Sequence, residues 1–319
     1  MNFQNQIILS DCRDFLDKID KESIDLFLSD IPYGINLDDW DVLHNNTNSA
    51  LLGQSPAQFG KTGFKKRGKP INGWSEVDKN SGKEYQDWCY SWAKQSFPIM
   101  KKGANVFIFG ARRTLHRAIN AMEDAGFLLK DVLAWKKQNA HHRAQKLSPI
   151  LEKRGLKIEA ENWEGWRLGN LAPIYEPIAW FFKPYDYTMT DNILEYGVGG
   201  LNLAEIGFSP TNLLEFGFEK GEEKFHEAQK PVKLIEFLIK LTTKENQIVL
   251  DPFMGSGTTA VACINTNRNF VGFEINQEYH QICLDRIENL LNKKEENLFI
   301  PKEKEIKNTK LKLVTNPIF

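Results

Sequence analysis

Two short segments that lie far apart in the chain carry residue types able to do chemistry. DIPYG, residues 30–34, places an acid, a proline, an aromatic ring and a glycine directly after an apolar run. DPFMGSGTT, residues 251–259, places two glycines and three hydroxyl side chains after another apolar run. Taken alone, DIPYG is typical of an ordinary turn. A carboxylate beside an aromatic ring is also suited to binding a flat amine.

The glycine segment predicts a sharp turn between a strand and a helix. Gly255 and Gly257 permit positive φ angles and let a ligand approach the backbone closely. The hydroxyl groups of Ser256, Thr258 and Thr259 suit the start of a helix, where exposed N–H groups attract negative groups. A Walker phosphate loop is excluded, because no lysine precedes the hydroxyl residues after the second glycine.

Two cofactors fit this turn. GSGTTA, residues 255–260, satisfies the GxGxxA pattern of dinucleotide sites, and Glu274 follows at roughly the spacing of a ribose-binding acid. A nicotinamide oxidoreductase is therefore one alternative. S-adenosylmethionine is the other, since it carries an adenosine without a pyrophosphate and needs only a ribose acid and a compact glycine turn.

The first segment favours the methyl donor, because it offers a place for a methyl acceptor. Asp30 and a backbone carbonyl can accept the two hydrogens of an exocyclic amino group. Tyr33 can stack on a base, and Pro32 fixes the backbone that aligns the acceptors. A base within duplex DNA has to be flipped out to reach such a pocket.

In this combination the chain resembles the N4-cytosine/N6-adenine DNA methyltransferase family, in the permuted order that places the catalytic motif before the cofactor motif. DIPY resembles the catalytic D-P-P-Y motif, with Ile31 in place of the first proline. DPFMGSGTT is very similar to the cofactor loop of the family.

Four further segments extend the resemblance over most of the chain. FHEAQKP, residues 225–231, resembles the H-x-x-Q-K-P element ahead of the helix beside the cofactor. LSDCRDFL, residues 9–16, resembles an N-terminal segment whose acid, here Asp11, reaches the adenine of the cofactor. NFVGFE, residues 269–274, resembles the strand that carries the ribose acid. YEPIAWFFKP, residues 175–184, resembles a strand that lines the target-base pocket.

The resemblance implies a sequence-specific DNA methyltransferase that moves a methyl group from S-adenosylmethionine to the exocyclic amino group of a flipped base. The implied catalytic residues are Asp30, Ile31 through its carbonyl, Pro32 and Tyr33. The residues implied to bind the cofactor are Asp11, Cys12, Asp30, Lys230, Asp251, Phe253, Gly255, Ser256, Gly257, Thr258 and Glu274.

The identity of the acceptor leaves alternatives open. In the family an acid at the first motif position leans toward adenine and a serine toward cytosine, so Asp30 favours adenine N6 over the cytosine N4 alternative. A methyltransferase for RNA or for a protein amide is more distant, because that class usually places its cofactor loop before the catalytic motif.

The elements that must position these residues alternate between strand and helix patterns. Apolar runs predict strands at 6–10, 24–29, 104–110, 131–137, 176–183, 247–251 and 269–274. Helical spacing of apolar residues is found at 112–127, 231–243 and 277–291. This alternation is typical of an α/β fold with a largely parallel sheet. The resemblance implies the Rossmann-like, seven-stranded sheet of S-adenosylmethionine-dependent methyltransferases.

The predicted methyltransferase domain covers residues 1–292 and contains two segments that break the pattern. Residues 35–84 form a long polar insert without clear periodicity. Residues 184–224 are rich in glycine and predict a small separate lobe, which the resemblance assigns to target recognition. Residues 293–319 predict a charged C-terminal tail.

Composition indicates a cytoplasmic protein and limits the partners. The four cysteines are scattered and predict free thiols, no metal site is expected, and no apolar run is long enough to predict a membrane span. Lys plus Arg number 41 against 42 Asp plus Glu, so the overall charge does not itself indicate a nucleic acid. The expected partner is double-stranded DNA. A homodimer and a cognate restriction endonuclease acting on the same site are compatible with it.

Two basic clusters are candidates for contacts with DNA phosphates. One lies in the insert and the other follows the fourth predicted strand. Their members are Lys61, Lys65, Lys66, Arg67, Lys136, Lys137 and Arg143. Trp163 and Trp166 further along the chain can be core residues or can stack on bases, and the core is the expectation.

Overall fold

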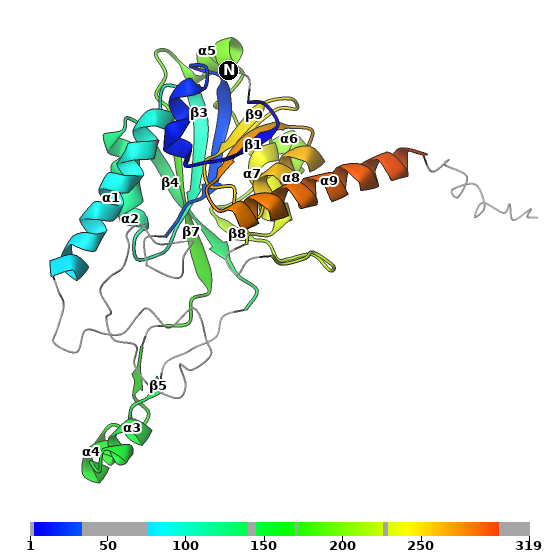
Figure 1. Ribbon diagram of the computed structural model, residues 1–319. Coiled ribbons are helices and arrows are strands. Elements are labelled where there is room, and N and C mark those ends of the chain that lie inside the picture. The colour runs from blue at the N-terminus through cyan, green and yellow to red at the C-terminus, as the bar shows by residue number, and fades with distance from the viewer. Residues whose placement is uncertain (1–2, 34–75, 140–144, 170, 226–228, 300–319) are drawn as a thin grey trace, which may run out of the picture.

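The computed structural model describes residues 3–33, 76–139, 145–169, 171–225 and 229–299 (Figure 1). Most of the predicted insert and most of the predicted tail fall outside these residues. None of the helices in the described part combines the length and the hydropathy that a membrane span needs.

An eight-stranded sheet forms the centre of the molecule, in the order β1-β10-β9-β2-β3-β7-β4-β8. Its strands are β1 (Gln6–Leu9), β2 (Ile24–Asp30), β3 (Met100–Phe109), β4 (Leu128–Lys136), β7 (Tyr175–Phe182), β8 (Leu213–Glu215), β9 (Ile248–Asp251) and β10 (Asn269–Glu274). β7 runs antiparallel to both of its neighbours, and all other pairs are parallel. The predicted α/β sheet is confirmed. It has eight strands instead of seven, because β8 pairs with β4.

Alternating side chains along each strand build two apolar layers. In β2, Phe27 joins the buried cluster that includes α1 (Glu76–Ser96) and α2 (Leu115–Asp124). Leu26 and Leu28 point to the opposite face and join the cluster that includes α7 (Val232–Thr242) and α8 (Thr258–Asn265). Figure 1 shows α1 and α2 on one side of the sheet and α7, α8 and α9 (Gln277–Phe299) on the other. A sheet covered on both faces explains why its strands are nearly continuous apolar runs.

Acidic residues gather at one edge of this sheet. Asp30 ends β2, Asp251 ends β9, Glu274 ends β10, and Asp11 follows the end of β1. These four strands are neighbours and parallel, so their carboxyl ends meet at the same edge. The reversed direction of β7 brings its second residue, Glu176, to that edge as well.

Two helices extend across predicted boundaries. α1 starts at Glu76, inside the segment predicted to be an irregular insert up to residue 84. The segment EVDKNSG at residues 76–82 contains one apolar side chain, that of Val77, and shows no helical period. The buried residues described in this helix begin at Tyr85 and include Cys89 and Trp92. α9 likewise extends to Phe299, past the predicted end of the domain at residue 292.

Residues 184–224 do not form a separate lobe. α5 (Met189–Tyr196) contacts β3, α6 (Leu203–Ile206) contacts α7, and β8 joins the central sheet. The buried guanidinium of Arg268 donates hydrogen bonds of 2.8 Å to both carboxylate oxygens of Glu205 and one of 2.7 Å to the carbonyl of Thr243. Target recognition by residues 184–224 stays a prediction.

A small unit instead projects from the body of the molecule. It consists of the two-stranded sheet β5 (Gln145–Lys146) and β6 (Arg167–Leu168) and the helices α3 (Ser148–Lys153) and α4 (Lys157–Asn162) (Figure 1). Trp163 and Trp166 pack edge to face in it, with 43% and 60% of their surfaces exposed. The expectation that these two residues lie in the core is therefore wrong.

The Arg268 contacts predict a large loss of stability in Arg268→Met. The change leaves two buried carbonyls, those of Thr243 and Thr266, without their donor. We expect the free energy of unfolding in urea to fall by about 2 to 3 kcal/mol. Lys136→Met is the control, because the ion pair of Lys136 with Glu215 is exposed and should cost under about 0.5 kcal/mol. Equal losses in the two variants would show that Arg268 does not tie α6 to the sheet.

Candidate functional site

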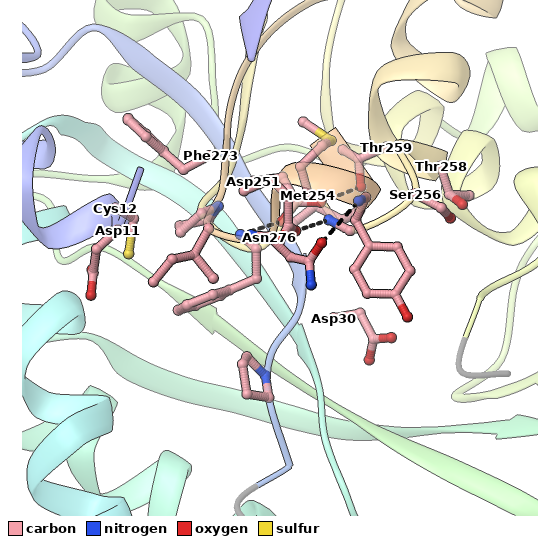
Figure 2. A pocket seen from close by; sticks show the side chains of 18 of the residues that line it. Asp11, Cys12, Asp30, Asp251, Met254, Ser256, Thr258, Thr259, Phe273 and Asn276 are labelled. Atoms are coloured by element: carbon pink, nitrogen blue, oxygen red, sulfur yellow. Dashed lines mark hydrogen bonds between the residues drawn. The ribbon is translucent and has the colours of Figure 1, made fainter. Parts of the chain in front are cut away.

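A cavity of about 710 Å³ opens at the carboxyl edge of the sheet. Residues of the DIPYG and DPFMGSGTT segments line it, together with residues that follow β1 and β10. Figure 2 shows Asp11 and Cys12 at one end and Ser256 and Thr258 at the other, with Asp251 between them. The predicted cofactor residues in its lining are Asp11, Cys12, Asp30, Lys230, Asp251, Phe253, Gly255, Ser256, Thr258 and Glu274, and Pro32 of the predicted catalytic set joins them.

The two glycines of the loop have different reasons to be glycine. Both adopt positive φ angles, +55° at Gly255 and +86° at Gly257. A Cβ at Gly257 would lie 2.2 Å from the sulfur of Cys283, so this residue lets α9 pack behind the loop. A Cβ at Gly255 would meet nothing within 4 Å, and Gly255 lines the cavity. Gly257 therefore serves packing, whereas Gly255 leaves room for a ligand.

Glu274 is fixed in place at the cavity by the backbone. One of its carboxylate oxygens accepts the N–H of Gly255 at 2.7 Å, and the other accepts the N–H of Asn276 at 2.8 Å. Each oxygen keeps a further lone pair, so the carboxylate can also accept ribose hydroxyl groups. Burial raises the pKa of Glu274 above its usual range, and these hydrogen bonds oppose that rise.

Asp251 joins the two segments. Its carboxylate accepts the hydroxyl of Ser29, one residue before Asp30, at 2.5 Å and the hydroxyl of Thr259 in α8 at 2.6 Å. The residue is 2% exposed, and this burial raises its pKa from 3.8 to about 6. The catalytic strand and the glycine loop are thus held to a common buried group.

Asp30 belongs to a cluster of charged side chains. Its Oδ2 accepts the ammonium of Lys230 at 2.5 Å, and its Oδ1 accepts the hydroxyl of Tyr33 at 3.1 Å. The ammonium of Lys230 also donates to the Tyr33 hydroxyl at 3.0 Å and lies 3.4 Å from Glu176. Glu176 forms a second ion pair with Lys137. Two carboxylates and two ammonium groups therefore balance in charge.

Burial and ion pairing shift the pKa values of these groups in opposite directions. Burial raises the pKa of Asp30, although the Lys230 ammonium opposes the rise. Burial alone would lower the pKa of Lys230, but the carboxylates of Asp30 and Glu176 raise it above its usual value. Burial opposes ionisation of Glu176, yet Lys230 and Lys137 keep its pKa below the usual range. The pKa values of the two carboxylates are therefore shifted in opposite directions.

The backbone of DIPY is held from behind by neighbouring helices. The carbonyl of Pro32 accepts the Tyr85 hydroxyl at 2.7 Å, and the carbonyl of Tyr33 accepts the Thr114 hydroxyl at 2.6 Å. Ile31 is 1% exposed and belongs to the same apolar cluster as Tyr85. An apolar side chain thus fills a buried position here, which explains how isoleucine replaces the proline of the motif.

Several predicted site residues have contacts or positions that the resemblance does not indicate. The carboxylate of Asp11 is held by the guanidinium of Arg13 at 2.6 Å. Ile31, Tyr33 and Gly257 lie outside the lining of the cavity. Tyr33 contributes its hydroxyl to the charged cluster.

The predicted DNA contacts stay predictions. Lys136 and Lys137 lie at the end of β4 and pair with Glu215 and Glu176. Residues 61–67 and Arg143 fall outside the described residues, as does His226 of the H-x-x-Q-K-P element. In the described ranges no group of three His, Cys, Asp or Glu is placed to hold a metal ion.

The sequence interpretation missed residues of α1 and one acid of β7. Trp88 and Ser91 line the cavity from α1 and lie three apart, a spacing that places them on one helical face. Asn276 lines it directly after the predicted ribose acid. Glu176 starts the strand predicted at 176–183, and the family resemblance assigns it no role. Its signal was an acid at the start of an apolar run.

The family described as DNA methylase matches residues 24–285 of the chain. Type II methyltransferase M.HindIII of Haemophilus influenzae is 45% identical over 297 residues, which cover 90% of this chain and 95% of that relative. Type II methyltransferase M.HinfI of the same species is 27% identical over 90% of this chain and 69% of that relative.

Solved structures share the fold. PvuII DNA methyltransferase (cytosine-N4-specific) superposes with a TM-score of 0.56 at 19% identity, over 90% of this chain and 91% of that one. A putative DNA modification methylase of Thermus thermophilus, complexed with S-adenosyl-L-methionine, gives a TM-score of 0.54 at 17% identity, over 88% and 92%. Both likenesses confirm the α/β architecture.

The raised pKa of Asp251 predicts a pH-dependent stability. Between about pH 4 and pH 6 the native state binds more protons at this group than the unfolded state, so stability falls as pH rises through that window. Asp251→Asn removes the titrating carboxyl group and with it this contribution to the pH dependence of stability. The free energy of unfolding in urea is measured at pH 4.5 and at pH 7 for both proteins. Between these pH values it should fall in the wild type by about 2 kcal/mol more than in the variant. The other carboxyl groups titrate in both proteins, so identical pH dependence would contradict the assigned pKa.

Proposed function

The chain belongs to the DNA methylase family, and from this premise we propose that it transfers the methyl group of S-adenosylmethionine to N6 of adenine in double-stranded DNA. One observation carries the proposal. The carboxylate of Asp30 and the loop of Gly255 line the same cavity, from the carboxyl ends of the neighbouring strands β2 and β9. An acceptor bound at Asp30 would therefore face a donor held by the loop.

The residues present fit the methyl donor. Gly255 leaves open space where a side chain would stand, and Glu274 offers a fixed carboxylate for the ribose. Phe253 and Trp88, whose ring centroids lie 5.4 Å apart, provide apolar surface in the lining. When bound, S-adenosylmethionine supplies a methyl group on a positively charged sulfur.

Asp30 would orient the acceptor and take up its proton. Its carboxylate accepts one amino hydrogen, and the carbonyl of Ile31 accepts the other, which directs the nitrogen lone pair toward the methyl group. As the nitrogen–carbon bond forms and the carbon–sulfur bond breaks, the nitrogen becomes positive. It then loses a proton to Asp30, and the raised pKa of this carboxylate favours uptake of the proton.

The choice of adenine rests on the acid at position 30. The family resemblance associates an acid at this motif position with adenine and a serine with cytosine. Ser29 comes one position earlier, and its hydroxyl is bonded to Asp251 behind the cavity. Ser29 is thus committed to a structural contact, which supports Asp30 as the residue that faces the base.

Identification of the methylated nucleoside tests the proposal. The protein is incubated with S-adenosylmethionine labelled in the methyl group and with unmethylated bacterial DNA, and the DNA is digested to nucleosides. We expect the label in N6-methyladenine. RNA from the same source is the matched control, and it should remain unlabelled.

Other outcomes would change the assignment. Label in N4-methylcytosine would overturn the choice of adenine and leave the methyl-transfer chemistry of Asp30 in place. Absence of label from DNA would overturn the proposed function. The expected homodimer and restriction partner stay predictions, as does the cytoplasmic location.

A further inference from the structure

Both carboxylate oxygens of Asp30 already accept hydrogen bonds from the protein. Oδ2 is taken by the Lys230 ammonium at 2.5 Å and Oδ1 by the Tyr33 hydroxyl at 3.1 Å. The function proposed above requires Asp30 to accept a hydrogen from the target amino group. An amino group that approaches Asp30 therefore competes with donors of the protein for the same carboxylate.

Lys230 is the donor whose position allows the target amino group to replace it on Asp30. Lys230 and Asp30 both line the cavity, whereas Tyr33 does not. The Lys230 side chain is only 3% exposed, so its charge cannot move into water when it leaves Asp30. A buried ammonium without an anion is strongly unfavourable. The exchange thus needs a second carboxylate within reach.

Glu176 supplies that carboxylate. It lies 3.4 Å from the Lys230 ammonium, close enough for a small shift to convert the contact into a direct hydrogen bond. It does not line the cavity, so it leaves the substrate to Asp30. Lys137 pairs with its other oxygen, and the ladder between β4 and β7 holds its backbone opposite Trp135. Glu176 is therefore an anion with a fixed position, outside the cavity lining, toward which the Lys230 ammonium can move.

We propose that Glu176 is a positioning residue for methyl transfer, which holds the Lys230 ammonium when the amino group of the target base takes its place on Asp30. The inference rests on the proposed function and adds a residue to which the sequence assigned no role. Glu176 acts through Lys230 and does not touch the base.

Because of the charges in the cluster, loss of the Glu176 charge should affect methyl transfer and not cofactor binding. Asp30 and Glu176 balance Lys230 and Lys137. Without the Glu176 charge, Lys230 loses one of the two ion pairs that it forms among the described residues, and its ammonium stays on Asp30 more firmly. The target amino group then competes with a stronger ion pair, which slows transfer and leaves the cofactor loop unchanged.

The test compares Glu176→Gln with a matched control, Glu215→Gln. Glu215 pairs with the adjacent Lys136 and is exposed. The readouts are single-turnover methyl transfer to unmethylated DNA, the affinity for S-adenosylmethionine, and thermal unfolding. We expect Glu176→Gln to slow transfer by about 100-fold, with the cofactor affinity within about 2-fold of the wild type. Glu215→Gln should match the wild type in all three.

Two further variants separate positioning from loss of structure. Glu176→Asp keeps the charge and should recover part of the lost rate. In a Lys230→Met background, Glu176→Gln should cause no additional loss, because Glu176 acts through the ammonium that this background removes.

The remaining outcomes overturn the inference. Transfer by Glu176→Gln within about 3-fold of the wild type, or an equal loss in the Lys230→Met background, would show that Glu176 does not act through Lys230. A wild-type protein that methylates no DNA would instead overturn the proposed function, and the inference with it.

Discussion

The ion pair between Lys230 and Asp30 is the interaction on which the site depends. Its two members are 200 residues apart in the chain, and they meet because β2 ends at the edge where the segment before α7 crosses. A buried carboxylate left alone would bind a proton and lose its value as an acceptor. The ammonium opposes the rise that burial causes in the pKa of Asp30, and Glu176 with Lys137 balances the charges of the cluster. The ion pairs that balance the buried charges therefore also prepare Asp30 to accept a hydrogen bond from the substrate.

Features that depend on local sequence could be predicted. All seven strands expected from apolar runs are present, because a sheet covered on both faces needs continuous apolar segments. The loop that contains Gly255 and Gly257 adopts the expected positive φ angles, since no other residue type fits such a turn as well. Asp30, Asp251 and Glu274 could be assigned to one site, because Asp251 and Glu274 end predicted strands of a parallel sheet and Asp30 directly follows another.

Features that depend on distant partners could not be predicted. β8 is three residues long and gains its place from pairing with β4, so residues 184–224 were expected to be separate. The first turns of α1 carry few apolar residues, and its identity as a helix comes from Tyr85, Cys89 and Trp92 packing on the sheet. The role of Glu176 follows from the reversed direction of β7, which no local pattern reveals.

The central claim is that Asp30 acts on the substrate and is not needed to build the cofactor site. Single-turnover methyl transfer and affinity for S-adenosylmethionine, measured in Asp30→Ala beside the exposed control Asp186→Ala, test it most directly. The account predicts that transfer falls by at least about 1,000-fold, whereas the cofactor affinity stays within about 3-fold. Retention of transfer in Asp30→Ala at a rate near that of Asp186→Ala would contradict it.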